Sequence, residues 1–209
     1  MVTDKDFKKA YNLFDPKMPL MGENLQYYVP RQAEILNQLK RQIEASEGDA
    51  KILFSGIPGC GKSTELTMLL KELETNYFPV CISVIDMMEI TDVQIADLLL
   101  VMCIKLYEKT QQENLEIDQT VINNIKDWFN EVTQIKHKEE GHQASAGFVL
   151  KYLLEVGAKI RTESTTRLEI RDRVKHRLSD LINRMNDLIR EIEIKCSKEV
   201  ILSVDDLDK

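Results

Sequence analysis

The sequence predicts an α/β protein in which a large helical insertion separates two of the strands. Three apolar runs have the length and composition of buried strands: residues 52–54, 79–85 and 199–204. A glycine-rich loop follows the first run and leads into a segment with helical periodicity. The span 91–198 carries helical periodicity almost throughout. Strands that alternate with helices indicate the α/β class, and the length of the helical span predicts the insertion.

The glycine-rich loop is the most specific motif of the chain. Residues 56–63 read G-I-P-G-C-G-K-S and match G-x-x-x-x-G-K-[ST] at every fixed position. The glycines let the backbone fold so that its N–H groups converge on one anion beside a helix N-terminus. Lys62 would bring a positive charge to the β- and γ-phosphates, and the Ser63 hydroxyl would bind Mg²⁺. The alternative is a glycine-rich turn that holds no ligand. The expected nucleotide-binding residues are Gly56, Gly59, Cys60, Gly61, Lys62, Ser63 and Thr64.

Two aspartates follow the last apolar run directly. A strand end would hold Asp205 rigidly, so that its carboxylate orients the water shell of Mg²⁺. Asp206 would then be placed to polarise an attacking water molecule. This pattern is typical of a Walker B element, although strands also often end in an acidic turn. We therefore expect Ser63 and Asp205 as the metal ligands and Asp206 as the catalytic residue.

The two motifs together resemble those of P-loop NTPases, in the division that contains the AAA+ and STAND ATPases. Residues 61–66 (G-K-S-T-E-L) and 205–209 (D-D-L-D-K) are similar to the motifs of KAP-related bacterial ATPases. The resemblance implies a three-layer P-loop core, Mg²⁺ and ATP as ligands, and hydrolysis that drives a conformational or assembly switch. Most such enzymes carry Glu where this chain has Asp206.

In that family a further strand, sensor residues and an arginine finger follow the Walker B strand. The resemblance therefore implies an incomplete sheet here, the N-terminal part of a longer ATPase, and little turnover by this chain alone. The expected domains are residues 1–90 as the lead-in and loop-bearing half of the core, 91–198 as the helical insertion, and 199–209 as the Walker B strand. Two other functions stay open: a nucleotide-gated interaction module, and a small P-loop kinase, whose acidic element normally lies well before the C-terminus.

The helical insertion offers a surface for partners. A capping box at Thr91 and Gln94 is expected to open its first helix. Apolar residues spaced by four and three from Val174 to Ile192 predict one long helix, of about 30 residues and about 45 Å. This helix would either project as an arm or fold into a packed helical layer. A homo-oligomer or protein contact through the insertion is the expected partner interaction.

The start of that long helix is basic. Arg167, Arg171 and Lys175 fall on one helical face. A solvated charged face is the usual explanation. The functional alternative is a site for nucleic acid or for a neighbouring subunit's phosphates, although no aromatic side chains interleave these charges.

Composition favours a soluble, cytoplasmic protein that is not bound to a membrane. The 209 residues carry 28 Lys and Arg against 35 Asp and Glu, a net charge of −7, which gives no general attraction to nucleic acid. No apolar run approaches the ~18 residues of a membrane span, and the N-terminus lacks a signal peptide. The cysteines lack zinc-site spacing. Cys81, Cys103 and Cys196 are expected to be small buried hydrophobes, whereas Cys60 is either a tolerated small residue or a redox-sensitive one.

Ahead of the glycine-rich loop lies a lead-in with a proline at position 30, which suits a helix start. The family resemblance makes Tyr28 and Val29 candidates to flank the adenine. The other interpretation is that these residues anchor the following helix to the core.

Overall fold

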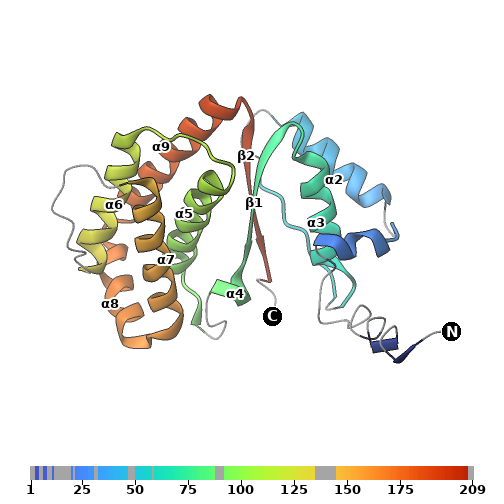
Figure 1. The fold of residues 1–209 in the computed structure, drawn as a ribbon, viewed down its shortest axis with the longest axis horizontal. Helices are drawn as coiled ribbons and strands as arrows, with labels where there is room; N and C mark the ends of the chain where they lie inside the picture. The colour runs from blue at the N-terminus through green and yellow to red at the C-terminus, as the bar shows by residue number, and fades with distance from the viewer. Residues whose placement is uncertain are drawn as a thin grey trace. The chain divides into compact units, whose positions relative to one another are not determined.

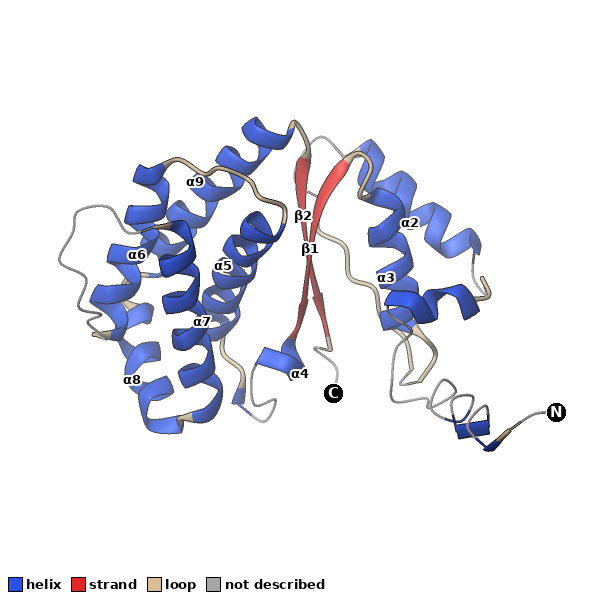
Figure 2. Ribbon diagram, in the orientation of Figure 1, coloured by secondary structure: helices blue, strands red, loops and turns tan. Residues whose placement is uncertain are grey.

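The computed structural model describes residues 3–4, 7–8, 11, 20, 22–30, 33–46, 50–57, 59–87, 92–134 and 145–206. The chain forms two compact units, Met1–Asn76 and Tyr77–Lys209. Helices account for most of the described residues (Figure 2). The boundary after Asn76 differs from the expected ones after residues 90 and 198, because the second strand and the whole helical span belong to one unit.

The first unit contains the glycine-rich loop. The elements described over their whole length include the 3₁₀ helix η1 (Gly22–Tyr27) and the α-helices α2 (Ala33–Ala45) and α3 (Lys62–Leu73). Helices α2 and α3 contact each other (Figure 1). The buried apolar side chains of this unit come from one face of each helix, as expected for amphipathic helices. These side chains are Leu39, Leu69, Leu70 and Leu73.

The strand predicted at residues 52–54 is wrong. Residues 50–57 form neither a helix nor a strand. Ile52 and Leu53 are 41% and 87% exposed, so this apolar run does not enter a core. The pattern carries strand propensity, but a strand also needs a neighbour to accept and donate its backbone hydrogen bonds.

The second unit contains a pair of parallel strands, β1 (Tyr77–Ser83) and β2 (Glu199–Asp205). Their register runs from Tyr77 opposite Glu199 to Ser83 opposite Asp205. Both strands were predicted from the sequence, at residues 79–85 and 199–204, and both are confirmed. Successive side chains alternate between the two faces of a strand. Phe78, Val80 and Ile82 consequently enter the hydrophobic core of the unit.

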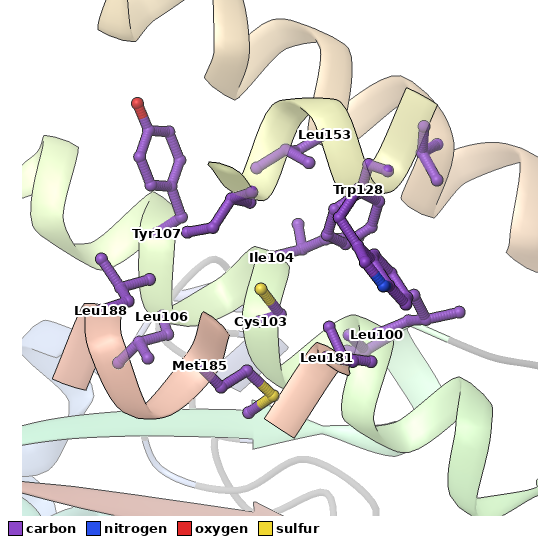
Figure 3. Close-up of a cluster of buried hydrophobic side chains, with 14 of the residues drawn as sticks. Leu100, Cys103, Ile104, Leu106, Tyr107, Trp128, Leu153, Leu181, Met185 and Leu188 are labelled. Atoms are coloured by element: carbon purple, nitrogen blue, oxygen red, sulfur yellow. The ribbon is translucent and has the colours of Figure 1, made fainter. Parts of the chain in front are cut away.

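The helices of the second unit are α4 (Val84–Met87), α5 (Ile95–Gln112), α6 (Gln119–Thr133), α7 (Ala146–Thr162), α8 (Ser164–Lys175) and α9 (Leu178–Cys196). Helix α5 contacts β1, α7, α8 and α9, which explains why its buried residues surround much of its axis. Figure 3 shows the resulting core, where side chains of α5, α6, α7 and α9 meet. The fully buried members at its centre include Leu100, Ile104, Tyr107, Trp128, Leu153, Leu181 and Leu188.

The predicted fold class is therefore wrong for the described part of the chain. A three-layer P-loop core with an incomplete sheet was expected, but the described residues are mostly helical and form one sheet of two strands. The helical span does not stand apart from the strands as an insertion. Its α5 and α9 pack directly against β1 and β2, so helices and strands share one core.

The prediction of one long helix through residues 174–192 is also wrong. The chain turns at His176 and Arg177 between α8 and α9, and the Arg177 N–H donates to the carbonyl of Val174 at 2.8 Å. No glycine or proline marks this turn. The two helices pack in the helical layer of the unit, which was the alternative to a projecting arm. The capping box of α5 lies three residues later than predicted, at Gln94 and Asp97, and Thr91 lies outside the described residues.

Candidate functional site

The glycine-rich loop has the backbone geometry that its sequence predicts at two of its glycines. Gly59 and Gly61 have φ of 79° and 92°, a region that side chains make costly, and Gly61 is the N-cap of α3. Gly56 does not have a positive φ. A Cβ there would lie 3.1 Å from Cys60 Sγ, a tight contact with an exposed side chain that can move. Pro58 lies outside the described residues. The loop thus curls into the first turn of a helix, where N–H groups lack intrahelical acceptors.

Lys62 is the first residue of α3, and its ammonium group lies over the loop. Its Nζ donates to the carbonyl of Gly56 at 2.8 Å and reaches the carbonyl of Ile57 at 3.4 Å. The side chain therefore folds back onto the loop. This arrangement places a full positive charge beside the positive end of the helix dipole, and both favour an anion.

The hydroxyl residues after Lys62 have different surroundings. Ser63 is half-buried in the first turn of α3. Thr64 Oγ1 accepts a hydrogen bond from the N–H of Leu20 at 3.1 Å, so the threonine holds the lead-in. Cys60 is exposed within the loop.

The two aspartates lie in the second unit, at the carboxyl end of β2. Asp205 is the last residue of the strand, and the Asp206 N–H donates to Asp205 Oδ1 at 2.9 Å. Asp206 has φ of 65°, a conformation that aspartate tolerates better than most residues. The Ser83 hydroxyl, at the end of β1, donates to Asp206 Oδ2 at 3.2 Å. Residues 207–209, and Asp208 with them, lie outside the described residues.

Ser83 is the contact that sequence reasoning missed at this end of the sheet. Its signal was the strand prediction itself, because carboxyl ends of parallel strands meet at one edge. The structure brings the loop residues 56–64 together in the first unit, and Asp205, Asp206 and Ser83 together in the second. The structure describes each of these two groups of residues separately and does not place one relative to the other.

The two expected magnesium ligands lie in different units, Ser63 in the first and Asp205 in the second. Among the described residues, no cluster of three or more His, Cys, Asp and Glu side chains is placed to hold a metal ion. The Ser63 hydroxyl and the Asp205 carboxylate each offer oxygen, the ligand atom that Mg²⁺ prefers. The magnesium site stays a prediction.

Tyr28 anchors the lead-in to helix α3. Its hydroxyl donates to Glu65 Oε2 at 2.5 Å. Loss of water around the phenol, together with the neighbouring Glu65 carboxylate, raises the pKa of Tyr28 to about 12. Val29 is 70% exposed and makes no contribution to the core. The adenine contact expected of these two residues stays a prediction.

The basic face predicted on the long helix is wrong for two of its three residues. Arg167 and Arg171 are 6% and 2% exposed, and Lys175 is exposed. The helical pattern placed the three residues on one face correctly, but that face packs inward at its first two positions. Arg171 is occupied by the carboxylates of Asp97 and Asp92. Its guanidinium therefore belongs to the interior of the unit.

Of the cysteines expected to be buried, only Cys103 is fully so, and burial raises the pKa of its thiol to about 12. Cys196 is half-buried. Cys81 is exposed, because its position alternates with the core residues Val80 and Ile82 along β1. Water lost around the sulfur and the nearby Asp205 carboxylate both raise the pKa of the Cys81 thiol.

Comparison of the chain with protein-family models, with curated proteins and with solved structures finds no match. None of the helices in the described part of the chain is long and apolar enough to cross a membrane.

Proposed function

We propose that the chain binds Mg·ATP through the loop at residues 56–63. The observation that carries the proposal is the backbone of the loop, with φ of 79° at Gly59 and 92° at Gly61, closed by the ammonium of Lys62. Turns with alternating backbone conformations form concave sites for anions, and the helix dipole adds to the positive potential there. A nucleoside triphosphate supplies the matching charge.

In this proposal each polar residue has a distinct task. When ATP binds, the Lys62 ammonium gives up its hydrogen bond to the Gly56 carbonyl and donates to phosphate oxygens instead. Ser63 ligates the magnesium ion. Asp205 and Asp206 keep the roles that the sequence predicts for them, as a magnesium ligand and as the residue that orients water for attack on the terminal phosphate. Binding of ATP rests on the loop alone, whereas hydrolysis also needs the aspartates of the second unit.

Lys62→Ala tests binding. The variant loses the charge that meets the phosphates, so its affinity for Mg·ATP should fall at least tenfold, or about 1.4 kcal/mol, in a calorimetric titration. Lys71→Ala is the matched control, because Lys71 is an exposed lysine in the last turn of the same helix. Its affinity should stay within twofold of the wild type. Equal affinities for the wild type and Lys62→Ala would refute the proposal.

A further inference from the structure

Helix α3 buries the carboxylate of Glu65 close to the phosphate loop. Glu65 lies in the first turn of α3, three residues after Lys62, and is only 7% exposed. Burying a carboxylate is costly unless hydrogen bonds replace the lost water. The Tyr28 hydroxyl supplies one such bond, at 2.5 Å from Oε2. The phenol, whose pKa is raised from its ordinary value of 10.0 to about 12, is protonated and able to donate throughout the physiological range.

A second bond ties Leu20, just ahead of residues 22–30, to the same helical turn. The N–H of Leu20 donates to Thr64 Oγ1 at 3.1 Å. Thr64 and Glu65 are consecutive and directly follow Lys62 and Ser63. The segment before α2 thus makes two hydrogen bonds to the turn that carries the proposed phosphate ligands.

We propose that Tyr28 is a positioning residue of the nucleotide site: through Glu65 it couples the order of the lead-in segment (residues 22–30) to that of the phosphate loop. The inference rests on the proposed binding of Mg·ATP. A ligand that fixes the first turn of α3 also fixes whatever is bonded to that turn. By linkage, a lead-in held in place raises the affinity for the ligand by the same factor.

The size of the coupling follows from the bond. A hydrogen bond to a charged group is stronger than one between neutral groups, and part of its free energy is coupled to binding of the ligand. Tyr28→Phe removes only the hydroxyl, so it should weaken Mg·ATP binding by about three- to tenfold. Glu65→Gln keeps an oxygen that accepts from Tyr28 and should cost less than Tyr28→Phe. Tyr27→Phe, at the neighbouring and 49% exposed tyrosine, should leave the affinity unchanged.

Hydrogen–deuterium exchange separates this role from a merely structural one. In the wild type, Mg·ATP should slow exchange both in a peptide spanning the phosphate loop and in one spanning the lead-in. In Tyr28→Phe, Mg·ATP should still protect the loop but no longer the lead-in. Tyr27→Phe should behave as the wild type.

The possible failures are distinguishable. If the loop of the wild type gains no protection from Mg·ATP, nucleotide binding is refuted, and the positioning role falls with it. If the wild-type loop is protected and the lead-in is not, the positioning role alone is refuted. Equal protection of the lead-in in Tyr28→Phe and in the wild type would also overturn it.

Discussion

Arg171 donates from Nε to both carboxylate oxygens of Asp97, each at 2.9 Å, and both side chains are only 2% exposed. Asp97 also accepts from the N–H of Gln94 at 3.0 Å and so closes the capping box of α5. The same guanidinium reaches the carboxylate and the carbonyl of Asp92. One arginine of α8 therefore fixes the N-terminus of α5, the helix at the centre of the core.

Asp97→Asn should destabilise the second unit strongly. The substitution keeps the shape of the side chain but leaves the Arg171 charge buried without its main counter-charge. Removing one partner of a buried pair costs about 3–5 kcal/mol in free energy of unfolding. Trp128, the one tryptophan of the chain, is 1% exposed, so its fluorescence should report unfolding of this unit in urea.

Glu113→Gln provides the control for that measurement. Glu113 pairs with Lys109 at 2.7 Å, but its side chain is 50% exposed. Exposed pairs of this kind contribute about 0.5 kcal/mol or less. A loss for Asp97→Asn as small as that of Glu113→Gln would contradict the structural role of the buried pair.

Tyr107 should make the second unit sensitive to alkaline pH. Burial raises the pKa of its hydroxyl from 10.0 to about 12, and the hydroxyl donates to the carbonyl of Ala146. Because the pKa of Tyr107 is higher in the folded chain than in the unfolded chain, the protonated hydroxyl stabilises the folded state fully below pH 10.0. This stabilisation is lost as the pH rises from 10 to about 12. In that window the tyrosine lowers the free energy of unfolding by up to about 1.4 kcal/mol per pH unit.

The difference in free energy of unfolding between the wild type and Tyr107→Phe isolates the contribution of Tyr107 from that of other groups that titrate in this pH range, such as Cys103. Urea unfolding followed by Trp128 at pH 9, 10, 11 and 12 should give a shallower decline for the variant. Parallel declines would show that Tyr107 ionises equally in the folded and unfolded chain.

The sequence predicted those features that depend on local residues. The backbone of the glycine-rich loop follows from its glycines, because positive φ at Gly59 and Gly61 is a property of single residues. Strands β1 and β2 were found because each is a continuous run of apolar residues long enough to pair. The register that brings Ser83 to Asp206 was not predicted, since pairing depends on the whole fold.

Features that depend on distant partners were missed. Residues 52–54 have strand composition but pair with no strand in the described part of the chain. Arg167 and Arg171 look like a charged surface, and only the position of Asp97, far away in the sequence, shows why Arg171 is buried. The turn at His176 contains no glycine or proline, so the helical spacing of apolar residues continues across it and predicts one helix in place of two.

Gly61→Ala should weaken Mg·ATP binding without removing any side-chain contact. A non-glycine residue in a left-handed conformation costs about 1–2 kcal/mol, and Gly61 has φ of 92°. The free loop of the variant is expected to leave this conformation, and binding must then restore it, so the affinity should fall by about five- to thirtyfold in a titration. Gly147→Ala is the control, because a Cβ there meets nothing within 4 Å and lies inside α7. It should raise the stability of the second unit by up to about 1 kcal/mol and leave ATP affinity unchanged. An unchanged affinity in Gly61→Ala would mean that the loop binds nucleotide in another conformation.

The two aspartates should separate in their effects. Asp205 ends β2 and is the proposed magnesium ligand, so Asp205→Asn should reduce the gain in ATP affinity that Mg²⁺ provides. Asp206 is held by the Ser83 hydroxyl and is proposed to act on the attacking water. Asp206→Asn should keep Mg·ATP affinity within about twofold and remove whatever phosphate release the wild type shows above background, a rate expected to be low, because Asp206 acts mainly on the transition state. Titrations with and without Mg²⁺, together with a phosphate-release assay on each variant, make the comparison. An equal loss of Mg·ATP affinity in both variants would refute this division of roles.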